Sequence, residues 1–71
     1  MPNIKKATLK ERSYLVFSVK GKFPEAIAET WVKILAYFED ESIDERRSFG
    51  DEFEKYISKD EAEIYIEVNY F

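Results

Sequence analysis

Hydrophobic residues recur with the period of one helical face between Pro24 and about Phe38. The apolar side chains of this segment stand at i, i+4, i+7, i+8 and i+11, namely Ile27, Trp31, Ile34, Leu35 and Phe38. This spacing is typical of an amphipathic helix. Pro24 suits the first helical position and Glu25 the positive first turn, so we expect the helix to begin there and to end near Glu39.

Shorter runs predict strands on both sides of this helix. Before it, the segments Ile4–Lys10 and Tyr14–Val19 predict a hairpin or a bent strand pair, and the second run is rich in β-branched and aromatic residues. After it comes a charged loop that extends through Arg47. Alternation over Phe49–Ile57 and Glu63–Tyr70 then predicts two more strands, joined by a short polar turn.

The element order is therefore strand, strand, helix, strand, strand, in a single α+β module that spans residues 1–71. We expect a four-stranded antiparallel sheet with the one helix across one face. The residues predicted to face the helix are Leu15, Phe17, Phe53, Ile57, Ile64, Ile66 and Val68. Those predicted for the opposite face are Tyr14, Val16, Glu54, Tyr56, Tyr65 and Glu67.

Composition and charge narrow the possible functions by exclusion. The chain carries 11 basic and 15 acidic residues, and a net charge of −4 repels phosphate backbones, so we expect no direct nucleic-acid binding. It has no cysteine and no histidine, which excludes thiol chemistry, the usual zinc sites and a histidine-activated serine. With two glycines in all, no glycine-rich phosphate loop can form.

Metal and membrane sites are also not expected. The segment Asp40-x-Ser42-x-Asp44 resembles the start of a calcium loop, but its sixth position is Glu45 instead of glycine and its twelfth is Asp51 instead of glutamate. We therefore predict no metal and no cofactor. No apolar run approaches the roughly 20 residues of a membrane span, and the first residues lack the apolar region of a signal peptide. These features predict a cytoplasmic protein without membrane contact.

The predicted tyrosine-rich face allows two interpretations. In the first interpretation, Tyr56 and Tyr65 are cross-strand partners on a half-exposed face that Glu54 and Glu67 keep hydrated. Alternatively, the face is a pocket or a subunit interface, in which aromatic walls supply apolar area and a carboxylate selects a cation. Trp31 lies on the helical stripe, where packing in the core is the simpler expectation.

Four short segments resemble a known family in their order and spacing. They are Tyr14-Leu15-Val16-Phe17, Glu29-Thr30-Trp31, Phe53-Glu54-Lys55-Tyr56 and Glu63-Ile64-Tyr65-Ile66. Between about Ser13 and Val68 the chain resembles the gyrase-inhibitor-like small-molecule-binding domains. This family also supplies the effector-binding domains of AraC-type and multidrug-responsive transcription regulators. Its members carry two such modules with the ligand between them, whereas this chain has one, and Glu67 stands where the family usually has proline.

The resemblance implies a binding site and a ligand class. The family's pocket glutamate corresponds to Glu54, and its pocket aromatics correspond to Trp31, Tyr56 and Tyr65; Tyr14 joins them on the predicted face. The implied function is a bacterial module that binds a cationic, partly apolar small molecule, as a sensor or a sequestering protein. It also implies a homodimer in which two copies replace the two modules of the family.

Two other functions stay open at this point. Some relatives look like hydrolases that open strained electrophilic compounds, with Glu54 as the base. Base catalysis favours a carboxylate taken out of water, whereas cation binding needs one that stays ionised. The third possibility is a gyrase-inhibitor-like interaction module, in which an acidic surface contacts a macromolecular partner through Glu39, Asp40, Glu41 and Asp44.

Overall fold

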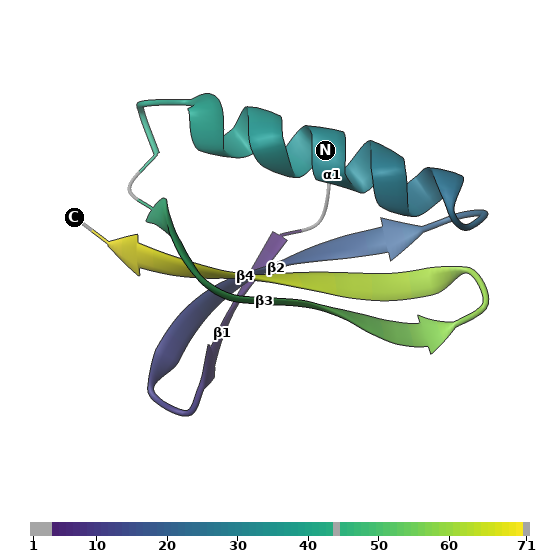
Figure 1. The fold of residues 1–71 in the computed structure, drawn as a ribbon, viewed down its shortest axis with the longest axis horizontal. Helices are drawn as coiled ribbons and strands as arrows, with labels where there is room; N and C mark the ends of the chain where they lie inside the picture. The colour runs from purple at the N-terminus through teal and green to yellow at the C-terminus, as the bar shows by residue number, and fades with distance from the viewer. Residues whose placement is uncertain (1–3, 44, 71) are drawn as a thin grey trace.

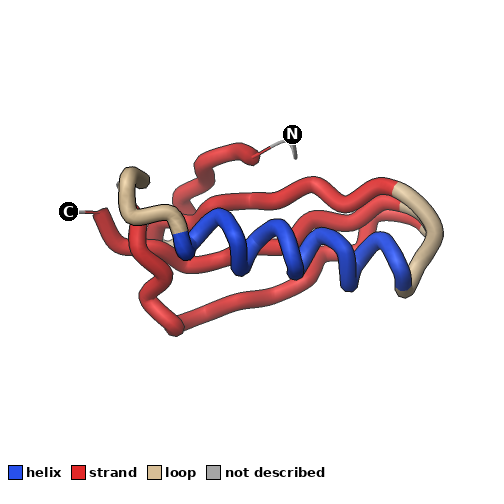
Figure 2. Tube along the Cα trace, turned by 90° about the horizontal axis from the view of Figure 1, so that it is seen from above, coloured by secondary structure: helices blue, strands red, loops and turns tan. Residues whose placement is uncertain are grey.

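The computed structural model describes residues 4–43 and 45–70. Its elements follow the predicted order, as Figure 1 shows: β1 (Ile4–Leu9), β2 (Arg12–Lys20), α1 (Glu25–Glu39), β3 (Glu45–Ser58) and β4 (Glu61–Tyr70). The strands form one antiparallel sheet in the order β1-β2-β4-β3. The helix lies across one face of this sheet (Figures 1 and 2). The predicted α+β fold class is therefore confirmed.

Helix α1 lies within one residue of the predicted segment. Pro24 occupies the N-cap position and not the first helical position, and Glu25 lies in the first turn as expected. At the other end Asp40 is extended, and its backbone N–H donates to the Tyr37 carbonyl at 3.3 Å. The buried Thr30 hydroxyl donates to the Ala26 carbonyl at 2.8 Å, so burying it leaves no polar group unpaired.

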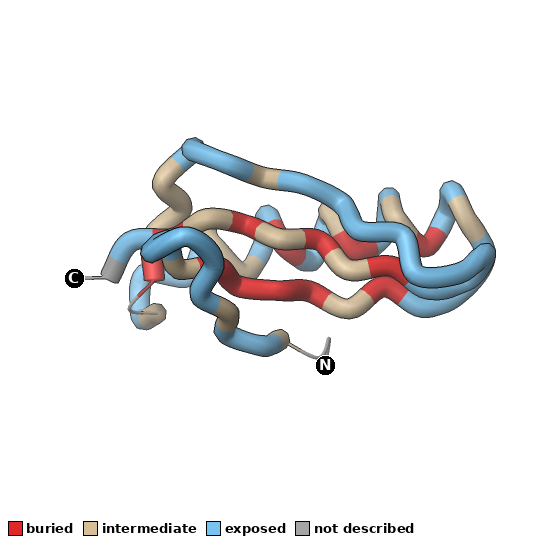
Figure 3. The backbone as a smooth tube through the Cα atoms, turned by 90° about the horizontal axis from the view of Figure 1, so that it is seen from below, coloured by how far each residue is buried: buried red, intermediate tan, exposed pale blue. Residues whose placement is uncertain are grey.

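The core lies between α1 and the two central strands of the sheet. Strands β2 and β4 pair so that Leu15 faces Ile66 and Phe17 faces Ile64, which aligns the apolar residues of both strands under the helix. Figure 3 shows the buried positions concentrated in these two strands. Phe17 is fully buried, and its ring contacts the rings of Tyr37 and Phe38 at centroid distances of 5.7 and 6.3 Å. The rest of the core is Val19, Ala26, Ile34, Ala62 and Val68.

Strand β3 begins earlier than predicted and contains a large bulge. Arg46 and Arg47 belong to the strand and not to the preceding loop, because they pair with Asn69 and Val68 of β4. Between Arg47 and Glu52 the register shifts, so that residues 48–51 of β3 stand opposite a single β4 residue. The extra residues break the alternation of the strand, which is why the sequence pattern placed its start too late.

The predicted faces of β3 are wrong. Phe53 pairs with Tyr65 and its ring stacks on the Tyr65 ring, with centroids 4.5 Å apart, so Phe53 lies on the face away from the helix. Glu54 pairs with Ile64 and therefore lies on the helix side. Phe53 and Ile57, both predicted for the core, are 40% and 55% exposed. A period of two fixes which residues share a face but not which face is covered, and here pairing with β4 decides it.

Candidate functional site

The candidate side chains predicted from the sequence lie on two faces of the sheet. Trp31, Glu54 and Tyr56 come together on the helix side, between α1 and the edge strand β3. Tyr14 and Tyr65 lie together on the face away from the helix, with their ring centroids 6.0 Å apart. The single tyrosine-rich face predicted from the sequence therefore does not exist, and the two groups need separate treatment.

The helix-side group, which we call the Trp31 site, is Trp31, Glu54 and Tyr56. The indole Nε1–H of Trp31 donates to Glu54 Oε2 at 3.1 Å, and the Tyr56 hydroxyl donates to Glu54 Oε1 at 2.8 Å. Each carboxylate oxygen thus holds one aromatic side chain in place. The pKa of Tyr56 is raised, chiefly because its hydroxyl donates to Glu54, so the phenol stays neutral and keeps its donor role. The Phe23 ring packs edge-on against Tyr56, at a centroid distance of 5.6 Å.

This site is open to solvent. Tyr56 is 58% exposed and Glu54 is exposed, while Trp31 is half-buried and packs against the core. Figure 3 shows β3 exposed along most of its second half. A carboxylate has about four lone-pair positions, so Glu54 keeps accepting capacity beyond its two bonds. The arrangement can therefore bind a cation at the carboxylate and present aromatic surface on either side of it.

An arginine that the sequence analysis placed in a loop also contacts this site. The Arg47 guanidinium lies 5.8 Å from the centroid of the Trp31 ring and 4.8 Å from that of Phe49. It donates through Nε and Nη2 to both oxygens of Glu52, each at 2.8 Å, and this pairing raises the pKa of Arg47. Glu52 and Glu54 are two residues apart in β3 and therefore share a face, and the pairing of Arg47 with Glu52 places Arg47 beside that face. The alternation could have shown this only if Arg47 had been predicted to lie in the strand.

The group on the other face is already closed by its own neighbours. Tyr14 is only 4% exposed because the rings of Phe53 and Tyr65 cover it, at centroid distances of 5.8 and 6.0 Å. The Tyr65 hydroxyl donates to Glu63 at 3.3 Å, and Lys5 neutralises that carboxylate at 3.3 Å. Burial, and then the charge of Glu63, raise the pKa of Tyr65. On this face the Tyr14 ring is covered and the Glu63 carboxylate is paired with Lys5, so neither is open to a ligand in the way that the tyrosine-rich face was expected to be.

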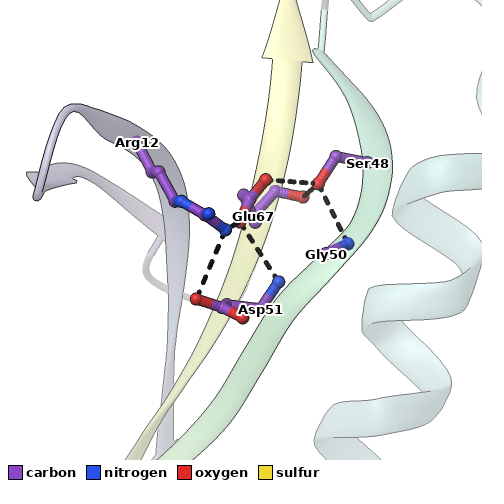
Figure 4. Close-up of polar contacts among 5 residues, drawn as sticks. All are labelled: Arg12, Ser48, Gly50, Asp51 and Glu67. Atoms are coloured by element: carbon purple, nitrogen blue, oxygen red, sulfur yellow. Dashed lines mark hydrogen bonds and ion pairs between the residues drawn. The ribbon is translucent and has the colours of Figure 1, made fainter.

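The β3 bulge is held by the carboxylate of Glu67, the β4 residue opposite it (Figure 4). One oxygen accepts from the Asp51 backbone N–H at 3.1 Å and from Arg12 at 2.9 Å, and the other accepts from the Ser48 hydroxyl at 2.9 Å. The bond from the Asp51 N–H, together with those from Arg12 and Ser48, lowers the pKa of Glu67. These bonds fix the backbone of the bulge, which includes Phe49, and so they position the Phe49 ring that contacts the Arg47 guanidinium.

The acidic loop after the helix forms a local turn. Asp40 accepts from the Ser42 backbone N–H at 2.9 Å and from the Ser42 hydroxyl at 2.6 Å, and both bonds lower its pKa. Asp44, which the interaction hypothesis also invoked, lies outside the described residues. Within residues 4–43 and 45–70 no group of three or more acidic side chains is arranged to hold a metal ion. In the same part of the chain, no helix has the length and apolarity needed to cross a membrane.

The fold and the Trp31 site together define a small α+β module with an aromatic and carboxylate surface open to ligands. The family model for integron-associated effector binding protein (Cass2) matches residues 3–68, and the chain belongs to this family. An effector-binding family indicates a role in binding small molecules, which agrees with the function class predicted from the sequence. No curated protein and no solved structure matches the chain.

Proposed function

We propose that this protein binds a cationic, partly apolar small molecule at the Trp31 site, as a sensor or a sequestering protein. The observation that carries the proposal is the carboxylate of Glu54, held between the Trp31 N–H and the Tyr56 hydroxyl at 3.1 and 2.8 Å. Membership of an effector-binding family supports a ligand, and the chemistry of these three side chains supports its charge and its apolar part.

The physical basis is an attraction that combines charge and ring contact. A cation beside Glu54 gains Coulomb energy, and a cation over an aromatic ring gains about 0.5–1 kcal/mol at an exposed site. An anion would meet the Glu54 carboxylate and a chain whose net charge is −4. The site therefore discriminates by sign of charge, while the rings of Trp31 and Tyr56 contribute affinity for flat apolar groups.

The exposure of Glu54 favours binding over hydrolysis. A general base is most effective when burial removes its carboxylate from water, and Glu54 is exposed. Both of its oxygens also accept bonds, from the Trp31 indole N–H and the Tyr56 hydroxyl, and these bonds fix the orientation of the carboxylate. These features suit a group that holds a ligand in place better than one that reacts with it.

We further propose a homodimer, on different grounds from those first expected. Tyr14 and Val16, which were predicted for the tyrosine-rich face, are 4% and 2% exposed, so they add no apolar surface on which a second copy could pack. The large apolar side chains that remain exposed on α1 and in the β3 bulge are Val32, Leu35 and Phe49. Leu35 and Phe49 line a groove with Arg47, which contacts Trp31, so a second copy seated there would add walls to the Trp31 site. Sedimentation should then report twice the 8.5 kDa of one chain.

Replacing Glu54 with glutamine is expected to remove charge selectivity and leave the shape of the site unchanged. The matched ligands are 2-naphthamidine, a flat cation, and 2-naphthamide, its neutral counterpart. The variant should bind the cation up to about fivefold more weakly, or about 1 kcal/mol, because it loses an exposed ion pair and keeps the ring contacts. Calorimetric titration measures both affinities, and that of the neutral ligand should not change.

The control is Glu63→Gln, which removes a carboxylate beside Tyr65 on the other face. It should leave the affinity for 2-naphthamidine within about twofold, because Lys5 already neutralises Glu63 and the site lies across the sheet. Equal losses in the two variants would show that only the net charge matters. An unchanged affinity in Glu54→Gln would remove Glu54 from the site.

A further inference from the structure

In the free protein a cationic side chain of the chain itself, that of Arg47, already lies against the Trp31 ring. The Arg47 guanidinium lies 5.8 Å from the Trp31 centroid and 4.8 Å from the Phe49 centroid, so it contacts both rings. Glu52 anchors it with two bonds of 2.8 Å from the same strand. Arg47 and Glu52 keep 18% and 22% of their side-chain area in contact with solvent. This set reproduces within the chain the contacts that a flat cationic ligand would make at Trp31.

We propose that Arg47 competes with the ligand, covering the Trp31 ring in the free protein and leaving it when a cation binds. The inference rests on the proposed function, because it concerns the same ring. The Arg47 guanidinium can leave the Trp31 ring without a change in the core, because Phe49 is 75% exposed and Arg47 lies in the edge strand of the sheet. The competition lowers the affinity of every ligand, because each must displace the Arg47 contact with the Trp31 ring before it can make its own contact there.

The competition also favours one shape of ligand. A guanidinium is flat and delocalised, and it uses the ring face together with a carboxylate. A flat cation such as an amidinium replaces those contacts in kind and gains Glu54 besides, whereas a compact ammonium replaces the ring contact less completely. Flat, delocalised cations with an aromatic body are therefore the ligand class that the Trp31 site selects.

The test removes Arg47 and Glu52 together, so that the net charge stays at −4. The variant Arg47→Gln/Glu52→Gln uncovers the Trp31 ring without adding charge to the protein. It should bind 2-naphthamidine about two- to fivefold more tightly, the factor that corresponds to one recovered ring contact. Arg47→Lys, which keeps the charge and loses the flat group, should show part of the gain. Calorimetry gives the affinities, and urea unfolding confirms that each variant is folded.

The matched control is Arg46→Gln. Arg46 is the neighbouring arginine, and its guanidinium donates to the backbone carbonyls of Ile43, Glu45 and Glu41. Its replacement removes one positive charge close by, and the affinity should stay within about twofold, the size of a screened surface charge effect. A gain in Arg46→Gln equal to that of the double variant would assign the effect to general electrostatics and overturn the inference.

The outcomes separate this inference from the function on which it rests. If Glu54→Gln weakens binding of 2-naphthamidine but the folded double variant binds no more tightly than the natural chain, Arg47 supports the fold and does not compete. If neither the natural chain nor the double variant binds the cation, both proposals fail. A gain in the double variant together with a loss in Glu54→Gln supports both.

Discussion

Replacing Phe17 with alanine is expected to remove a large part of the free energy of unfolding of this protein. Phe17 is fully buried under α1 and contacts the rings of Tyr37 and Phe38. Removing a buried phenylalanine costs about 3–5 kcal/mol through lost burial and the cavity left behind. A domain of this size has a total stability of about 4–10 kcal/mol, so one such change removes much of it. Urea unfolding followed by circular dichroism measures the loss.

Phe53→Ala is the comparison that tests the assignment of faces. Phe53 is 40% exposed on the face away from the helix, where its loss removes the stack on Tyr65 and an edge contact with Tyr14, and should cost about 1–2 kcal/mol. The milder Phe17→Leu, at about 1–1.5 kcal/mol, provides a measurable value if the alanine variant does not fold. A Phe53→Ala loss as large as that of Phe17→Ala would contradict the assignment of Phe17 to the main core under the helix and of Phe53 to the partly exposed face.

The second large effect is expected at Gly50, in the bulge of β3. A Cβ atom at this position would lie 2.7 and 2.8 Å from the two carboxylate oxygens of Glu67. The carboxylate cannot move away without losing its bonds to Asp51, Ser48 and Arg12. Gly50→Ala should therefore cost about 1–3 kcal/mol, the range for an added methyl group in a filled space, despite the reduced entropy of the unfolded chain. Chemical denaturation measures the change.

A double-mutant cycle identifies the cause of that loss. In a Glu67→Ala background the carboxylate is absent, so Gly50→Ala should be nearly neutral in that protein. If Gly50→Ala is equally destabilising in both backgrounds, then the contact with Glu67 is not responsible. The cycle also tests whether Glu67 fixes the segment that carries Phe49.

The sequence was sufficient for the elements whose pattern is continuous. The apolar stripe located α1 to within a residue, and Ile64, Ile66 and Val68 were correctly assigned to the helix side of β4. It failed for β3, where two apolar residues at alternate positions, Phe53 and Ile57, were taken for core. The helix leaves the outer strand uncovered, so the helix side of β3 is polar and its far side holds the aromatic stack with Tyr65. Which face is covered depends on tertiary packing that alternation does not encode.

The wrong faces predicted for β3 also led to a wrong grouping of the candidate site residues. Three of the four residues that the resemblance assigned to the pocket lie together, namely Trp31, Glu54 and Tyr56, although the alternation had placed Glu54 and Tyr56 on the far side from Trp31. The fourth, Tyr65, lies on the other face. The contacts of Arg47 with the rings of Trp31 and Phe49 depend on a bulge of residues 48–51. The Glu67 carboxylate, from another strand, holds this bulge in place, so the local sequence pattern of β3 does not predict it.

The location of the ligand is the central claim, and one spectrum tests it most directly. The chain has a single tryptophan, so its indole N–H gives one resonance in a proton–nitrogen correlation spectrum. On titration with 2-naphthamidine this resonance should shift and saturate together with the amides of Glu54 and Tyr56. Amides of Tyr14 and Tyr65, on the other face of the sheet, should stay in place. Shifts confined to Tyr14 and Tyr65, with the Trp31 indole unmoved, would place the ligand on the wrong face for this account and contradict it.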